Sequence, residues 1–138
     1  MATKLSQHDI RKIAVQYLYS LELRPDQAED YLLTFILEVE DRELSEENII
    51  YFEELISAVK ENKGNIDVEI SKFLNKNWTI QRLTVIDRII LRLAVEEILN
   101  SEIPVVIIID EALNLAKDFS DPAASKLING ILTNFVEK

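Results

Sequence analysis

Residues that interrupt helices are scarce in this chain. It contains two glycines and three prolines among 138 residues, and these two residue types destabilise a helix interior more than any others. Its apolar residues recur at spacings of three and four, the period of a helix face, rather than at the spacing of two that is typical of strands. These features predict an all-α fold, a compact bundle of about seven helical segments.

The first helical segments are bounded by short polar signals. Ser6 and Asp9 have the spacing of a capping box, in which a hydroxyl and a carboxylate satisfy free backbone N–H groups, and they mark the first helix start. The apolar stripe of this helix runs until Arg24-Pro25-Asp26 interrupts it. A second helix is predicted over residues 28–39.

The next two segments are expected to be separate helices. One begins at a Ser45 cap and is predicted to stop at Asn62-Lys63-Gly64-Asn65, where a left-handed residue would end it. A shorter helix then covers residues 66–74. Trp78 follows in a connecting segment, and we expect it to plug the core rather than to contact a ligand.

The C-terminal half is predicted to hold the most buried helix. Residues 83–99 are apolar on nearly every side, which indicates a central position. Pro104 suits the first position of the following helix, although the β-branched run Val105 to Ile109 is also compatible with a strand. A last helix opens near Pro122 and continues across Asn129-Gly130, where we expect Gly130 to make a close helix-packing contact.

No internal repeat or linker interrupts this pattern, and the predicted helices are joined by short connections. The sequence therefore predicts a single helical domain over residues 1–138.

The acidic residues are unevenly distributed. The net charge is −10, which by itself argues against nucleic-acid binding, because phosphate contacts depend on Lys and Arg. Between Ser20 and Glu61, however, there are thirteen acidic residues and only three basic ones, and the remainder of the chain is balanced. The acidic stretch is either a solvated surface or one of two surfaces with different partners.

Composition also excludes several classes of site. The chain has no Cys and one His, which leaves too few ligands for a zinc centre, so no metal and no cofactor are expected. The phosphate-binding and nucleophile motifs of common enzymes are absent. A general base needs a fixed partner and a water-excluding pocket, which the first helical turn around His8 does not readily supply, so no catalytic residue and no enzyme activity are expected. Neither a signal peptide nor a membrane-spanning segment is found, which predicts a cytoplasmic protein.

The first helix carries a second, mixed surface opposite its apolar stripe. His8, Lys12, Val15 and Tyr19 fall on this face, and Arg11 flanks it. A cationic and aromatic strip of this kind can bind phosphates and stack a base. The alternative is that another helix covers Tyr19.

Two stretches of the chain resemble the NusB family of transcription antitermination factors. They are Trp78-Thr79-Ile80-Gln81-Arg82-Leu83-Thr84-Val85-Ile86-Asp87-Arg88-Ile89-Ile90-Leu91-Arg92-Leu93-Ala94, and Ile103-Pro104 through Asp110-Glu111-Ala112-Leu113-Asn114-Leu115-Ala116-Lys117-Asp118-Phe119. Ser125-Lys126-Leu127-Ile128-Asn129-Gly130-Ile131-Leu132 and the first-helix segment Ala14-Val15-Gln16-Tyr17-Leu18-Tyr19-Ser20 are also similar to the family, whereas residues 21–77 match poorly.

The resemblance implies an all-α fold of two subbundles and a role in RNA-dependent transcription control. Family members bind the boxA RNA element together with NusE, a protein of the small ribosomal subunit, and the pair joins RNA polymerase during ribosomal RNA transcription. The matching positions imply an RNA site formed by Arg11, Lys12, Tyr19, Phe73, Asp87 and Lys126. A carboxylate at Asp87 can accept hydrogen bonds from base amino groups, or it can cap a helix or pair with an Arg.

The chain departs from the family pattern at two places. Many members carry an arginine cluster where this chain has Ser6-Gln7-His8-Asp9 ahead of Arg11, and position 127 is Leu where an aromatic residue is common. Both differences predict weak RNA binding by this protein alone and a larger contribution from the partner protein.

Two other interpretations remain open. The chain could be a pure protein-interaction module without RNA binding, such as a homodimer in which a second copy covers Val15 and Tyr19. It also resembles the NusB-like domain fused to RNA cytosine methyltransferases, although no catalytic domain follows within this sequence.

Overall fold

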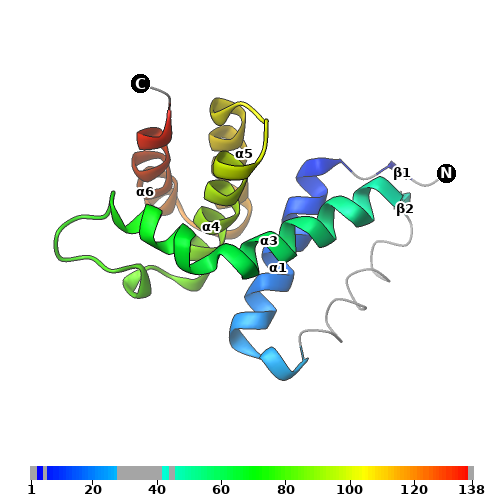
Figure 1. Cartoon of the computed structure of the whole chain (residues 1–138), viewed down its shortest axis with the longest axis horizontal. Helices are drawn as coiled ribbons and strands as arrows, with labels where there is room; N and C mark the ends of the chain where they lie inside the picture. Colours follow the sequence, from blue (N-terminus) through cyan, green and yellow to red (C-terminus); the bar gives the residue numbers. More distant parts are fainter. Residues whose placement is uncertain (1–2, 5, 28–41, 44–45, 137–138) are drawn as a thin grey trace. The chain divides into compact units, whose positions relative to one another are not determined.

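The computed structural model describes residues 3–4, 6–27, 42–43 and 46–136. Within them lie five α-helices: α1 (Gln7–Leu23), α3 (Glu46–Ser71), α4 (Val85–Asn100), α5 (Val105–Phe119) and α6 (Pro122–Leu132) (Figure 1). Three single turns of 3-10 helix accompany them: η1 (Pro25–Gln27), η2 (Ile80–Arg82) and η3 (Thr133–Phe135). Two two-residue strands, β1 (Thr3–Lys4) and β2 (Arg42–Glu43), pair in parallel.

The described chain is helical, as predicted, but the expected count of about seven helices is wrong. The break expected at residues 62–65 does not occur, because α3 runs without interruption from Glu46 to Ser71 and merges two of the predicted helices. Gly64 does not have a positive φ, so it is not the left-handed residue that would end a helix there. The helix predicted over residues 28–39 lies outside the described residues.

The chain divides into two compact units, Met1–Ser57 and Ala58–Lys138. In the first unit α1 begins at the predicted capping box: the Asp9 N–H donates to Ser6 Oγ at 3.1 Å, and the Ser6 N–H donates to Asp9 Oδ2 at 3.0 Å. Its inner face buries residues that include Ile10, Ala14 and Tyr17. The Tyr17 ring meets Phe52 of α3 edge-on, with ring centroids 6.2 Å apart.

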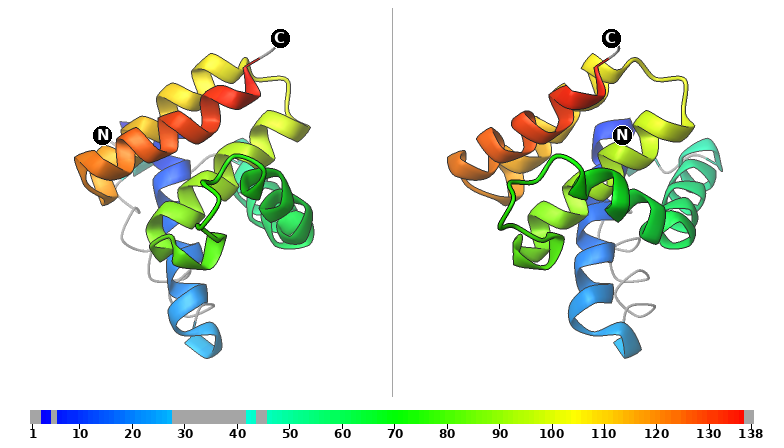
Figure 2. Two further views of the ribbon diagram at one scale, coloured as in Figure 1. Left: turned by 90° about the vertical axis from the view of Figure 1, so that its left-hand side faces the viewer. Right: turned by 60° about the vertical axis from the view of Figure 1, so that its left-hand side comes forward.

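The second unit is built around α4. This helix packs against both α5 and α6, which also pack against each other, and Figure 2 shows α5 and α6 side by side with α4 crossing them. The residues of α4 from Ile89 to Glu97 are all buried, which confirms the prediction of a central helix. Charged residues lie within this buried stretch of α4, so the residues that pair with them help to hold the unit together.

Two buried charged residues of α4 are satisfied by polar residues of α3. Arg92 donates through Nε and Nη2 to the two carboxylate oxygens of Asp67, at 2.8 and 2.9 Å. Glu96 accepts through Oε1 from Asn62 Nδ2 at 2.9 Å and through Oε2 from Asn100 Nδ2 at 2.9 Å. Unpaired buried charge is costly, so these bonds require α3 to stay helical from residue 62 to residue 67.

The boundaries of the last two helices are close to the predicted ones. Residues 105–109 open α5 and are helical, so the strand alternative is excluded, and Pro104 is the N-cap of α5 rather than its first helical residue. Pro122 opens α6 as predicted, behind an Asp121 carboxylate that accepts from the Ala124 N–H at 2.8 Å. The close packing expected at Gly130 is wrong, because a Cβ there would meet nothing within 4 Å.

Replacing Gly64 with alanine tests the continuity of α3. The site is helical, and an added Cβ would meet nothing within 4 Å, so Gly64→Ala should raise the free energy of unfolding by about 0.5–1 kcal/mol. Urea denaturation followed by circular dichroism measures this. A loss of stability would instead support the helix break that the sequence suggested, because alanine is unfavourable in a left-handed cap position.

Removing the Asp67 carboxylate tests the pairing between α3 and α4. The side chain of Arg92 is 8% exposed and that of Asp67 is 22% exposed, so Asp67→Ala should lower the free energy of unfolding by about 2 kcal/mol. The control is Glu69→Ala, which removes the more exposed pair of Glu69 with Lys72 on the same helix and should cost less than about 0.5 kcal/mol. Equal losses for the two variants would contradict a structural role for the Asp67–Arg92 pair.

Candidate nucleic-acid interface

The predicted cationic strip on α1 is only partly open to solvent. Tyr19 is 37% exposed, but Val15 is fully buried and Arg11 is only 5% exposed. The Arg11 guanidinium lies 5.8 Å from the centroid of the Tyr51 ring, a distance compatible with a cation–π contact. His8 and Lys12 are half-buried, so His8, Lys12 and Tyr19 are the accessible residues of this strip. An RNA contact by Arg11 stays a prediction.

Asp87 lies in the first turn of α4 and is 6% exposed. Its backbone N–H donates to the Oγ1 of Thr84, the N-cap residue of the helix, at 3.2 Å. Its carboxylate Oδ1 accepts from Ser120 Oγ at 2.9 Å. Asp87 therefore ties the start of α4 to the end of α5, and the base contact expected from the resemblance stays a prediction.

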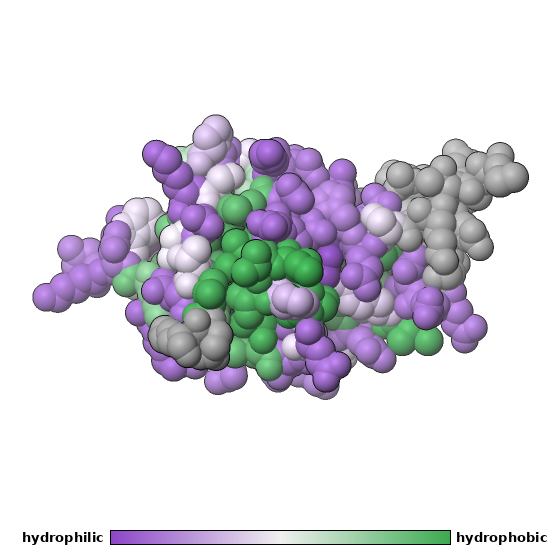
Figure 3. All heavy atoms as spheres, turned by 90° about the horizontal axis from the view of Figure 1, so that it is seen from above, coloured by the Kyte–Doolittle hydropathy of each residue, from purple (hydrophilic) through white to green (hydrophobic). Residues whose placement is uncertain are grey.

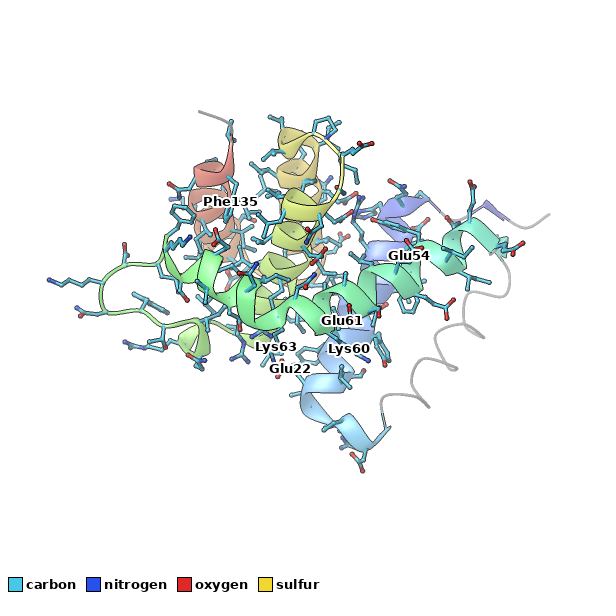
Figure 4. All side chains as sticks on the ribbon, in the orientation of Figure 1. Glu22, Glu54, Lys60, Glu61, Lys63 and Phe135 are labelled. Atoms are coloured by element: carbon cyan, nitrogen blue, oxygen red, sulfur yellow. The ribbon has the colours of Figure 1, made fainter. Side chains whose placement is uncertain are left out.

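Phe73 lies just beyond the last residue of α3 and is half-buried. Its ring meets Phe135 of η3 edge-on, with ring centroids 5.1 Å apart and an interplanar angle of 74°. Figure 4 shows Phe135 on the segment that follows α6, beside the end of α3. The pair leaves part of the Phe73 side chain accessible at the edge of the second unit.

Lys126 is exposed and lines an open groove between α5 and α6. The groove contains a second cation, Lys117, and two amide side chains, those of Asn114 and Asn129. Ammonium and amide N–H groups are donors suited to phosphate oxygens and base edges. The full lining consists of Asp110, Leu113, Asn114, Lys117, Ser125, Lys126 and Asn129.

Sequence reasoning selected Lys126 but missed the other groove residues. The spacing of these residues in the sequence could have indicated the groove. Asp110, Asn114 and Lys117 are separated by four and then three residues along α5, and Lys126 and Asn129 are three residues apart along α6. That spacing places polar side chains on one face of each helix. Only the packing of α5 against α6 shows that the two polar faces line the same groove.

The exposure of Trp78 differs most clearly from what the sequence predicted. The prediction of a core plug is wrong, because Trp78 is 45% exposed. The guanidinium carbon of Arg82 lies 5.0 Å from the centroid of the indole. This solvent-facing aromatic residue lies between α3 and α4, on a segment that also carries Lys72 and Lys76.

An apolar patch surrounds the start of α5. Figure 3 shows hydrophobic atoms gathered on this face. Among the large hydrophobic residues of this region, Leu99 is 41% exposed, Val106 is 59% exposed and Ile107 is 55% exposed. RNA recognition does not account for an aliphatic surface of this kind, which is more typical of a protein contact.

The six residues predicted for the RNA site fall in two groups. Arg11, Lys12 and Tyr19 share α1 in the first unit, whereas Phe73, Asp87 and Lys126 belong to Ala58–Lys138. Among the described residues, no group of three or more His, Cys, Asp or Glu side chains could hold a metal ion. None of the helices in the described ranges combines the length and hydropathy needed to cross a membrane.

Comparison with known proteins identifies the family. The model of the NusB family matches residues 8–137. The chain belongs to the NusB family. It is 42% identical over 132 residues to the transcription antitermination protein NusB of Ligilactobacillus salivarius, an alignment that covers 96% of this chain and 98% of that protein. It is 34% identical over 142 residues to the protein of the same name from Enterococcus faecalis, with 99% and 92% covered.

Solved structures of NusB proteins share the fold. The structure of T. maritima NusB has a TM-score of 0.81 and 32% identity, and the match covers 96% of this chain and 92% of that one. A crystal structure of the antitermination factors NusB and NusE in complex with dsRNA has a TM-score of 0.76 and 27% identity, with 94% of each chain covered. The resemblance inferred from the sequence motifs is therefore confirmed.

A double-mutant cycle tests the role of Asp87 at the junction of α4 and α5. Asp87→Ala and Ser120→Ala should each lower the free energy of unfolding by about 1–2 kcal/mol, because each removes a partly buried hydrogen bond to a charged group. The double variant should lose about 1 kcal/mol less than the sum of the two. The matched control combines Ser120→Ala with Asp110→Ala at an exposed position of α5, where the effects should add. Additive effects in the Asp87 cycle would refute the coupling.

Proposed function

We propose that this chain is a transcription antitermination factor that binds boxA RNA together with NusE and joins the RNA polymerase complex during ribosomal RNA transcription. The observation that carries the proposal is the match of the NusB family model to residues 8–137. A NusB structure with NusE and dsRNA, at 27% identity and a TM-score of 0.76, supports both an RNA and a protein partner. The proposal includes a non-enzymatic adaptor role in the cytoplasm, which the relatives named as antitermination proteins support.

The groove between α5 and α6 is proposed as the main phosphate-binding surface. Lys126 and Lys117 supply two cations there, and Asn114 and Asn129 supply amide groups that can hydrogen-bond to phosphate, sugar or base edges. Lys126 comes from the family resemblance, and the structure adds the other three. Such a groove can hold a strand by its backbone without selecting its sequence.

The remaining predicted residues take different parts in the proposal. Tyr19 and Phe73 supply aromatic surface for base contacts, and Lys12 supplies a further cation. Arg11 and Asp87 are buried, so they are proposed to act mainly by holding α1 and α4 in place. The Ser120 hydroxyl donates to Asp87 Oδ1, and the carboxylate keeps further lone pairs that could accept from a base amino group.

Few phosphate contacts imply weak and salt-sensitive binding by the protein alone. Neutralising about three phosphates of a single strand gives a slope of log K against log salt of about −2, so a fourfold rise in salt should weaken binding by roughly 20-fold. A partner protein that adds its own contacts compensates for this weakness. The expected behaviour is therefore weak RNA binding alone and stronger binding with NusE.

The direct experiment is fluorescence anisotropy of a labelled boxA RNA. A scrambled RNA of the same length serves as control, and each RNA is titrated with this protein, with NusE and with both, at two salt concentrations. Selective binding that strengthens when the proteins are combined is the expected result. No preference for boxA under any condition would overturn the proposal.

Removing the groove cations should weaken boxA binding in a salt-dependent way. The double variant Lys117→Gln/Lys126→Gln should lower affinity at low salt by about fivefold or more. It should also reduce the magnitude of the salt slope by about 0.7 for each phosphate that the variant no longer neutralises. Lys63→Gln, at an exposed lysine of α3, is the matched control and should change neither quantity. An unchanged salt slope in the double variant would exclude the groove as a phosphate site.

A protein-interaction module without RNA binding is the second candidate. The exposed apolar patch of Leu99, Val106 and Ile107 favours this second candidate, because RNA binding does not require an exposed aliphatic surface. A homodimer through α1 is less favoured than the sequence suggested, since Val15 is already buried. Sedimentation equilibrium distinguishes the candidates: a tight dimer unaffected by boxA RNA would favour the interaction module.

A further inference from the structure

The segment between α3 and α4 concentrates positive charge around the only tryptophan of the chain. Residues 72–82 contain Lys72, Lys76 and Arg82 and no acidic residue. Trp78 is 45% exposed within this segment. Leaving so large an aromatic surface in contact with water costs free energy, and an exposed aromatic residue among cations is a common arrangement in sites that bind single-stranded nucleic acids.

Two backbone turns fix the main chain on either side of Trp78. The Trp78 N–H donates to the Asn75 carbonyl at 2.8 Å, and the Arg82 N–H donates to the Thr79 carbonyl at 3.0 Å. The second of these turns is anchored by Ile80, which is 5% exposed. The backbone at Trp78 is therefore ordered by the turn that ends at it and by the anchored turn that follows it, which reduces the backbone entropy lost when a ligand binds.

Arg82 is held beside the indole. Its guanidinium carbon lies 5.0 Å from the ring centroid, and its Nη1 donates to the Asn77 carbonyl at 2.9 Å. A guanidinium carries more donors than this single bond uses. The remaining N–H groups are available for a phosphate next to a base that stacks on the indole.

An open groove adjoins the indole. Besides Trp78 it is lined by Asp67, Val68, Ser71, Lys72, Thr79, Ile80 and Gln81. The hydroxyl, amide and ammonium groups among these residues can bond to base edges and sugar hydroxyls. Lys72 is exposed and pairs with Glu69 at 2.8 Å, and it supplies a cation to the lining of the groove.

We propose that Trp78 and Arg82 form a stacking site for one unpaired RNA base, with the Arg82 guanidinium on the adjacent phosphate. The inference rests on the proposed RNA-binding function and adds a nucleotide subsite to it, together with a preference for single-stranded over duplex RNA. Bases inside a duplex are already stacked on their neighbours, so their faces are not available to the indole. The positive charge and polar groove favour RNA over a protein partner at this position.

The single tryptophan makes a direct test possible. Stacking of a base on Trp78 should quench its fluorescence during titration of the wild-type protein with single-stranded boxA RNA, with the same midpoint as the anisotropy titration. A duplex of the same sequence should quench much less at equal concentration. Quenching by NusE rather than by RNA would assign the indole to a protein contact and would overturn the inference.

Variants then measure the contribution of the stack. Trp78→Ala should weaken single-stranded boxA binding about five- to hundredfold, since stacking on an aromatic side chain contributes that much for each base. Trp78→Phe should restore most of the affinity because it keeps an aromatic face, and Arg82→Gln should weaken binding and lower the salt slope. Lys63→Gln, at an exposed lysine of α3 in the same unit, is the control and should bind as the wild type does.

Failure of the stacking site and failure of the proposed function would give different results. The wild-type protein could bind boxA without a change in fluorescence, and Trp78→Ala could bind within twofold of wild type. These two results together would overturn the stacking site without contradicting the proposed function. Absence of boxA binding by the wild-type protein, with and without NusE, would remove the proposed function itself. Circular dichroism and urea denaturation of Trp78→Ala show whether a loss of binding reflects a loss of folding.

Discussion

The buried charges of α4 determine how the second unit is built. Arg92 and Glu96 are about 5–6% exposed, and each needs a polar partner because an unpaired buried charge is costly. Asp67 and Asn62 of α3 provide those partners, and they can do so only if α3 is helical between them. The same pairing holds the end of α3 against α4, and the segment that carries Trp78 and Arg82 leaves α3 from this fixed end.

The parts of the fold that depend on local chemistry could be predicted from the sequence. Ser6 and Asp9 form the capping box that their spacing indicates, and Asp121 and Pro122 open α6 as expected. The break at Asn62-Lys63-Gly64-Asn65 was a wrong prediction because local propensity was outweighed by tertiary bonds. In the sequence, Asn62 indicates the end of a helix. In the structure it lies within α3 and donates a hydrogen bond to Glu96.

The candidate site was harder to predict because exposure is a property of packing. Arg11 and Asp87 have the residue types of an RNA contact, but both are buried. Trp78 has the residue type of a core plug, but it is exposed beside Arg82. Lys117 joins Lys126 only through the packing of α5 on α6. Charge is unevenly divided between the two units: Met1–Ser57 has thirteen acidic and five basic residues, whereas Ala58–Lys138 has twelve acidic and ten basic ones.

The most direct test of this account is ultraviolet cross-linking of unmodified boxA RNA to the wild-type protein in the presence of NusE, with the cross-linked peptides identified by mass spectrometry. The method needs no substitution and samples RNA contacts along the whole chain in one experiment. We expect cross-links within residues 72–82 and within the α5–α6 groove between Asp110 and Asn129. Cross-links confined to the acidic start of α3, around Glu46 and Glu47, or their absence from both predicted regions, would contradict it.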